Sequence, residues 1–113
     1  MTTALDAVDR FNKAFDAKDL DAIMAAMTPD CVFEVTRPPD GHRHLGADAV
    51  RSAWTTLFTA SPQGAFTTEE VIPAGNGVVV RWRYDFGNGH VRGVGIFAIR
   101  DGLVAEKLAY VKG

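Results

Sequence analysis

Three glycine-containing turns divide the C-terminal half of the chain into four segments of similar length. The turns are Gly75-Asn76-Gly77, Gly87-Asn88-Gly89 and Arg100-Asp101-Gly102, and the segments are 66–72, 78–86, 90–99 and 103–111. The segments are rich in β-branched and aromatic residues, which favour strands, and such turns join antiparallel neighbours. The spacing therefore predicts an antiparallel meander. We interpret GNGHVRG (87–93) as a hairpin, because its glycine spacing is wrong for a dinucleotide loop.

The N-terminal half carries the apolar spacing of three and four residues that is typical of amphipathic helices. Thr3 and Asp6 match the capping box of a first helix, and Asp19 can cap a second helix. A third helix is expected from residue 47. The apolar positions are Ala4, Val8, Phe11 and Phe15, then Leu20, Ile23, Met24 and Met27, then Val50, Ala53, Trp54, Leu57 and Phe58. Pro29 is expected to end the second helix, ahead of a short strand at 31–35.

The bulk composition favours one globular domain, residues 1–113, in a reducing compartment. A chain of 113 residues can bury one core, and its formal net charge of -2 provides no broad basic field for nucleic acid. Cys31 is the single cysteine, so no intramolecular disulfide can form. The N-terminus lacks a signal-peptide pattern, and no apolar run is long enough to span a membrane. We therefore expect a cytoplasmic protein that binds neither nucleic acid nor membrane.

The order of these elements, together with three local motifs, resembles the nuclear transport factor two-like cone, particularly its SnoaL-like and ketosteroid isomerase-like branch. The motifs are DAKDLDAIMAAMTPDCVFE (16–34), HLGADAVRSAW (44–54) and GIFAIRDGLVAEKLAY (95–110). The resemblance covers nearly the whole chain. It implies an α+β fold in which three N-terminal helices pack on a strongly curved antiparallel sheet, cystatin-like in form. It also implies a cone with a pocket at one end and a convex sheet face that forms a homodimer.

The resemblance to ketosteroid isomerase does not extend to its catalytic groups. That enzyme uses an aspartate base and an oxyanion hole made of a tyrosine and a protonated aspartate. The corresponding positions here look like Val35, Phe11 and Gly95. These residues cannot move a proton or donate an acidic hydrogen bond, so isomerisation by that mechanism is not expected.

The catalytic acids of two other relatives are also absent from this sequence. Limonene epoxide hydrolase places an Arg-x-Asp pair in its central strand and an aspartate in its last strand, and SnoaL-type cyclases use a last-strand acid. The matching positions here look like Trp82, Tyr84 and Ala109. A shift of one residue would instead turn Arg83 and Asp85 inward. The alternation of apolar side chains favours the register that keeps Trp82 and Tyr84 inside.

The residues on the inner faces of these elements are the expected ligand-binding set. They are Phe11, Phe15, Met27, Phe33, Val35, Trp54, Phe58, Val80, Trp82, Phe97, Lys107 and Val111. Most of them would equally suit an ordinary core, because apolar residues at regular spacing usually pack together. Lys107 stands apart, because an inward lysine can pair with an acidic ligand or act as a base if burial lowers its pKa.

The polar candidates are Tyr84 and residues of the loop TRPPDGHRHLG (36–46). Tyr84 can donate a hydrogen bond to a ligand carbonyl or phenol. The prolines and the Asp-Gly turn suit a rim or lid, where His44 or Asp40 could transfer protons. His42, His44 and Asp40 form no recognised metal-site spacing. We therefore name Tyr84, His44 and Asp40 as catalytic candidates, and we expect neither a metal nor a cofactor.

Three functions fit this sequence. The favoured one is a pocket protein for a small apolar molecule, with its reaction unassigned because the family's acids are absent. One alternative is an isomerase, cyclase or hydrolase of a polyketide, steroid or terpene-like substrate, using Tyr84 with His44 or Asp40. The other is a non-catalytic dimerisation module. Its surface would be the convex patch, formed by Val79, Val94, Ile96, Leu108 and Tyr110.

Overall fold

The observed elements follow the expected order, with helices first and the meander last. The computed structural model describes residues 2–35 and 39–112. The helices there are α1 (Ala4–Asp16), α2 (Leu20–Ala25) and α3 (Ala47–Ala60). The strands are β1 (Met27–Val35), β2 (His42–Leu45), β3 (Ala65–Ala74), β4 (Gly77–Asp85), β5 (His90–Arg100) and β6 (Leu103–Val111).

The two N-terminal helices begin at the predicted caps. The Thr3 hydroxyl accepts a hydrogen bond from the Asp6 amide, and the Asp6 carboxylate accepts one from the Thr3 amide, at 3.1 and 3.2 Å. This reciprocal capping box satisfies two otherwise free donors of α1. Asp19 caps α2 by accepting from the Ala22 amide at 3.1 Å. Between the helices Lys18 has a φ of 54°, and this left-handed residue turns the chain away from the axis of α1.

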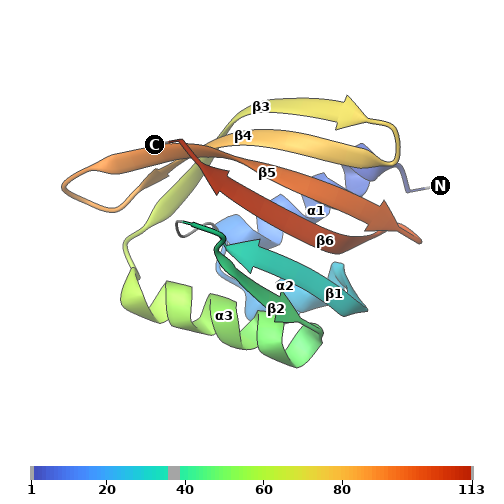
Figure 1. Cartoon of the computed structure of the whole chain (residues 1–113), viewed down its shortest axis with the longest axis horizontal. Helices are drawn as coiled ribbons and strands as arrows, with labels where there is room; N and C mark the ends of the chain where they lie inside the picture. The colour runs from blue at the N-terminus through green and yellow to red at the C-terminus, as the bar shows by residue number, and fades with distance from the viewer. Residues whose placement is uncertain (1, 36–38, 113) are drawn as a thin grey trace.

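The six strands form one curved, unclosed sheet in the order β2-β1-β6-β5-β4-β3 (Figure 1). Strands β3 to β6 make the predicted antiparallel meander. Asp101 and Gly102 both have positive φ in the β5–β6 turn, as a tight hairpin of this composition requires. One pairing differs from a purely antiparallel sheet, because β1 runs parallel to β6.

Two boundaries differ from the sequence prediction. Met27 belongs to β1 and not to the second helix. The Val104 amide of β6 donates to the Ala26 carbonyl, and pairing between β1 and β6 begins at Met27. Pro29 lies inside β1, where the pairing register shifts and no ladder donor is needed. The expected loop also contains a strand, β2, which pairs with Val32–Val35 of β1. Its sequence HRHL has no apolar alternation, so the partner strand and not local propensity makes it extended.

The helices pack inside the curve of the sheet. Helix α1 contacts β3 to β6, and α3 contacts β1 and β2, below them in Figure 1. The centre of the core is aromatic: the Phe11 ring lies 5.5 Å from both Trp54 and Phe97 and 5.7 Å from Phe15. Cys31 is a buried free thiol. No helix of the described residues is long and apolar enough to cross a membrane.

Candidate functional site

A lysine amine lies inside the aromatic core. Register places Lys107 of β6 between Phe33 of β1 and Phe97 of β5, so the three side chains form a row across the sheet. Helix α1 covers this row with Phe11 and Phe15. Lys107 is 9% exposed, although lysines are among the residues least often buried.

Four rings surround the Lys107 amine, and we call them the aromatic cage. The Nζ atom lies 4.4 Å from the centroid of Phe15, 5.2 Å from Phe11, 5.5 Å from Phe97 and 5.8 Å from Phe33. Ring faces attract a cation at such distances, which offsets part of the cost of burying the charge. The arrangement can hold an ammonium or a neutral amine, with an apolar surface on most sides.

Burial lowers the pKa of Lys107 to about 8, against the opposing effect of the Asp16 carboxylate, whose negative charge favours the ammonium. Among the described residues, no carboxylate oxygen lies within 4.0 Å of the amine. Asp16 is the last residue of α1. Partial burial raises the pKa of its carboxyl group, and the positive charge of Lys107 offsets only part of this rise. The two groups therefore influence each other across a gap and do not form an ion pair.

Two neighbouring hollows lie on this side of the core, and Lys107 lines the smaller one. The outer chamber has a volume of about 280 Å³ and is lined by Phe15, Asp16, Lys18, Leu57, Phe58, Ser61, Gly64, Ala65, Phe66 and Tyr84. The inner pocket has a volume of about 20 Å³ and is lined by Asn12, Phe15, Asp16, Phe66, Thr68, Val80, Trp82, Phe97 and Lys107. Phe15, Asp16 and Phe66 belong to both, so the chamber and the lysine pocket share a wall.

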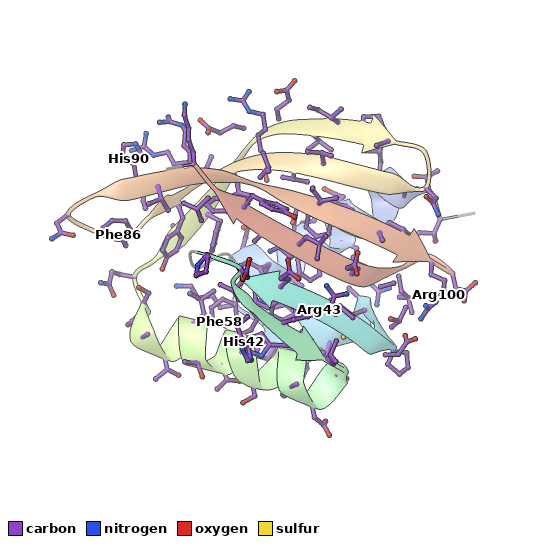
Figure 2. The ribbon with its side chains drawn as sticks, viewed as in Figure 1. His42, Arg43, Phe58, Phe86, His90 and Arg100 are labelled. Carbon is purple, nitrogen blue, oxygen red and sulfur yellow. The ribbon has the colours of Figure 1, made fainter. Side chains whose placement is uncertain are left out.

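The wall of the outer chamber is mostly aromatic. Phe58 extends from α3 toward the sheet (Figure 2), and its ring lies 5.2 Å from that of Phe15. Phe66 of β3 lies 5.3 Å from Phe15 and 4.4 Å from Tyr84 of β4. Lys18 closes one side by donating to the Pro62 carbonyl. Such a wall can bind a planar apolar molecule, and Tyr84 adds a hydroxyl.

Tyr84 reaches its position because Gly64 has no side chain. A Cβ at Gly64 would lie 2.1 Å from the Tyr84 hydroxyl oxygen, so the tyrosine occupies that space. Gly93 has the same relation to Trp82, whose ring would lie 2.6 Å from a Cβ there. On the opposite face of β4, the Arg83 guanidinium donates to the Asp85 carboxylate at 3.0 Å. The register therefore places Trp82 and Tyr84 in the walls of the hollows, with Arg83 and Asp85 outside.

The structure brings together part of the predicted ligand-binding set. Phe15, Phe58, Val80, Trp82, Phe97 and Lys107 line the two hollows. Phe11, Met27, Phe33 and Trp54 are buried core residues, and Val35 packs at the edge of the core. Val111 is 44% exposed and lines a separate hollow of about 300 Å³, which is also walled by Arg81, Arg92 and Tyr110.

The loop candidates lie apart from these hollows. Asp40 is exposed in a turn, and Thr36 to Pro38 of the predicted rim lie outside the described residues. The His44 ring stacks on the Phe33 ring with 6.0 Å between centroids, and the His42 ring lies 4.5 Å from the His44 ring. Partial burial and the neighbouring His42 lower the pKa of His44. Neither His44 nor Asp40 is among the lining residues of the chamber or the pocket.

No group of three His, Cys, Asp or Glu side chains within residues 2–35 and 39–112 could hold a metal ion. Sequence reasoning did not assign a role to Asp16, Asn12 or Phe66. Asn12 and Asp16 are four residues apart on one face of α1, next to Phe15. That spacing was a readable signal for a polar edge beside the apolar stripe.

Comparison with known proteins identifies relatives over nearly the whole length of the chain. A family model described as a SnoaL-like domain matches residues 8–107. An NTF2-like protein of unknown function from Mesorhizobium loti is 36% identical, with a TM-score of 0.86 over 97% of this chain and 91% of the other. A candidate polyketide cyclase from Sinorhizobium meliloti is 26% identical, with a TM-score of 0.83 over 93% and 94%.

A candidate ketosteroid isomerase from Kribbella flavida shares the fold, at 15% identity and a TM-score of 0.84 over 97% of this chain and 78% of the other. Among curated proteins the search found no match.

Proposed function

Because the chain belongs to the SnoaL-like family of the NTF2-like superfamily, we propose that it binds a small apolar molecule in the outer chamber. The observation that carries this proposal is the Lys107 amine, caged by aromatic rings in the inner pocket, which shares Phe15, Asp16 and Phe66 with the chamber. A protein that needed only a stable core would gain nothing from a lysine at this position. Relatives named as a polyketide cyclase and a ketosteroid isomerase support a cyclic, largely apolar ligand.

The polar groups around the chamber define how such a molecule would lie. Phe15, Phe58 and Phe66 supply apolar contact area, which gives affinity without direction. Tyr84 supplies a hydrogen-bond donor on the chamber wall, and Lys107 supplies one in the adjoining inner pocket. A ligand with an electronegative group directed at Lys107 and a flat ring against the phenylalanines satisfies both requirements.

A fluorescence titration tests this function. Trp82 lines the inner pocket and Trp54 contacts Phe15, so both report on occupancy. The ligands are steroid enones, planar phenols, terpene epoxides and polyketide-like aromatics. We expect at least one class to quench the fluorescence saturably. Tyr84→Phe should weaken the affinity for that class about fivefold, which corresponds to the usual net contribution of one hydrogen bond, about 1 kcal/mol. Tyr110→Phe is the matched control.

An outcome with no saturable response from any class would contradict the binding function. The aromatic side chains would then serve the core alone. Equal loss of affinity in Tyr84→Phe and Tyr110→Phe would show that the ligand does not lie in the outer chamber, because Tyr110 is 47% exposed and does not line it.

We also propose that the convex patch pairs two copies of the chain. In register, Val79 lies beside Ile96 and Ile96 beside Leu108, while Val94 lies beside Tyr110. Ile96 is 39% exposed, which is unusual for a β-branched residue in a continuous apolar patch. Sedimentation at micromolar concentration should show a dimer that Ile96→Glu converts to monomer. A wild-type monomer under these conditions would contradict the pairing.

A further inference from the structure

We propose that Lys107 is a nucleophilic amine that forms an imine with an apolar aldehyde or ketone bound in the outer chamber. This inference rests on the proposed binding function and adds to it the chemical class of the ligand and a covalent step. It comes from the surroundings of one side chain, which combine burial, an aromatic cage and an adjoining hollow that contains a carboxylate.

The first requirement is an amine that is neutral near physiological pH. A protonated amine has no lone pair to attack a carbonyl carbon, and an ordinary lysine is almost fully protonated at pH 7. With a pKa of about 8, about 1 in 10 Lys107 side chains is neutral at pH 7, against about 1 in 3,000 for a lysine at 10.5. Desolvation in an apolar pocket is a recognised way to activate a lysine. Asp16 is the charged group that opposes this shift.

The second requirement is room for the carbonyl next to Nζ. The inner pocket contains Lys107 and measures about 20 Å³, which fits a carbonyl group but not a ring. The outer chamber of about 280 Å³ shares Phe15, Asp16 and Phe66 with it. Lys107 lines the inner pocket and not the chamber, so a ring held in the chamber would have to direct its carbonyl past the shared residues Phe15, Asp16 and Phe66 to reach the amine.

The third requirement is a group that moves protons. The neutral amine attacks the carbonyl carbon, the C=O π bond breaks, and a proton moves from nitrogen to oxygen to give a carbinolamine. The hydroxyl group then takes up the remaining proton of the nitrogen, passed on by Asp16, the C–O bond breaks to release water, and the carbon–nitrogen double bond forms. Asp16 lines the same pocket, and partial burial raises its pKa toward the range in which it can exchange these protons. The overall change is amine plus carbonyl to imine plus water, and no oxidant or reductant is needed.

The probe for this reaction is 2-naphthaldehyde, with sodium cyanoborohydride to reduce any imine to a stable secondary amine. The protein is incubated at pH 7 with limiting aldehyde, and peptide mapping locates the adduct. We expect labelling at Lys107 at least 100-fold faster than at the exposed Lys112, in line with the difference in neutral amine. The rate should rise with pH and level off above about 8. The α-amino group of the chain is mapped separately.

Three variants and one control variant separate chemistry from structure. Lys107→Arg keeps the charge and Lys107→Met keeps most of the length, and both should abolish the adduct at this position. Asp16→Asn removes the proton-transfer group and also the charge that favours the ammonium, so it should slow the labelling of Lys107 at pH 9, where the amine is largely neutral with or without that charge. It should leave the binding of 2-methylnaphthalene, which has no carbonyl, unchanged. Lys112→Arg is the matched control and should not alter labelling of Lys107. Circular dichroism and thermal unfolding check that each variant folds.

The outcomes distinguish this inference from the function on which it rests. If 2-methylnaphthalene quenches the tryptophans but 2-naphthaldehyde leaves Lys107 unlabelled, the imine is overturned and the binding function stands. Lys107 would then act as a non-covalent partner for the ligand. Labelling of Lys107 no faster than that of Lys112 would also overturn the inference. If neither probe binds and no adduct forms, the imine is overturned, and the ligand panel described above decides whether the binding function stands.

Discussion

The two faces of the central strands differ in how their charged side chains are partnered. On the outer face, Arg81 pairs with Glu70 and Arg92 with Glu69, each at 2.9 Å and each partly exposed to water. On the inner face, Lys107 has four aromatic neighbours and no carboxylate within 4.0 Å in the described part of the chain. Exposed pairs of the first kind contribute little to stability, whereas a buried unpaired charge costs stability. The contrast shows which face carries a group that folding alone does not explain.

The largest expected effect is the loss of an aromatic core residue on the inner face. Phe11→Ala should lower the free energy of unfolding by about 3 to 5 kcal/mol, because Phe11 is fully buried and contacts Phe15, Trp54 and Phe97. Ile72 of β3 is 41% exposed, so Ile72→Ala should lower the free energy of unfolding by less than about 1 kcal/mol. Urea unfolding of both variants measures the difference. Equal losses would contradict the assignment of the core to the inner face.

The next effect is a gain in stability on removal of the buried charge. Between pH 8 and 10.5 the unfolded state binds more protons at Lys107 than the folded state, so wild-type stability should rise with pH across that window. Lys107→Met should therefore be more stable than wild type at pH 7, by up to about 3 kcal/mol. The advantage should shrink toward pH 10.5.

Urea unfolding of wild type, Lys107→Met and Lys112→Met at pH 7 and pH 10 measures this effect. Lys112 is exposed, so its replacement should leave stability nearly unchanged at both values. A Lys107→Met protein that is less stable than wild type at pH 7 would show that the amine stabilises the fold.

A smaller effect is expected at Gly64, because Tyr84 occupies the space that a side chain there would fill. Gly64→Ala should cost about 1 to 3 kcal/mol and reduce ligand affinity, because the new Cβ would meet the Tyr84 hydroxyl at 2.1 Å and displace the ring. Adding Tyr84→Ala should relieve that clash, so the double variant should lose less than the sum of the two single changes. Additive losses would contradict direct contact between the two residues.

The smallest effect belongs to the outer face. Glu70→Gln removes the ion pair with Arg81, whose side chain is 54% exposed, and should change the free energy of unfolding by less than about 1 kcal/mol. The change should diminish in high salt, which screens exposed pairs. Thermal unfolding with and without salt measures it. A large, salt-independent loss would show that the outer face is buried, as it would be in a dimer.

Much of the fold was readable from local patterns. The capping box at Thr3, the cap at Asp19 and the Asp101-Gly102 turn all lie where the sequence placed them. Strand β2 and the position of Met27 were not readable, because both depend on pairing with strands distant in the chain. Of the site, Tyr84 was named from alternation and Lys107 from the family resemblance of the closing hairpin, but Asp16 was not named, because an acid at a helix end usually faces solvent.

The sequence by itself determined the order of helices and strands, the alternation that turns Trp82 and Tyr84 to one face of β4, and the family to which the chain belongs. These follow from local chemistry, since turn residues, caps and side-chain periodicity act over a few neighbouring residues. The tertiary structure decided what surrounds Lys107. Its cage comes from α1, β1 and β5, and the carboxylate that faces it comes from a residue 91 positions earlier in the chain, Asp16. Desolvation depends on everything within a few ångströms, so its effect on this amine arises only when the sheet curves around the helix.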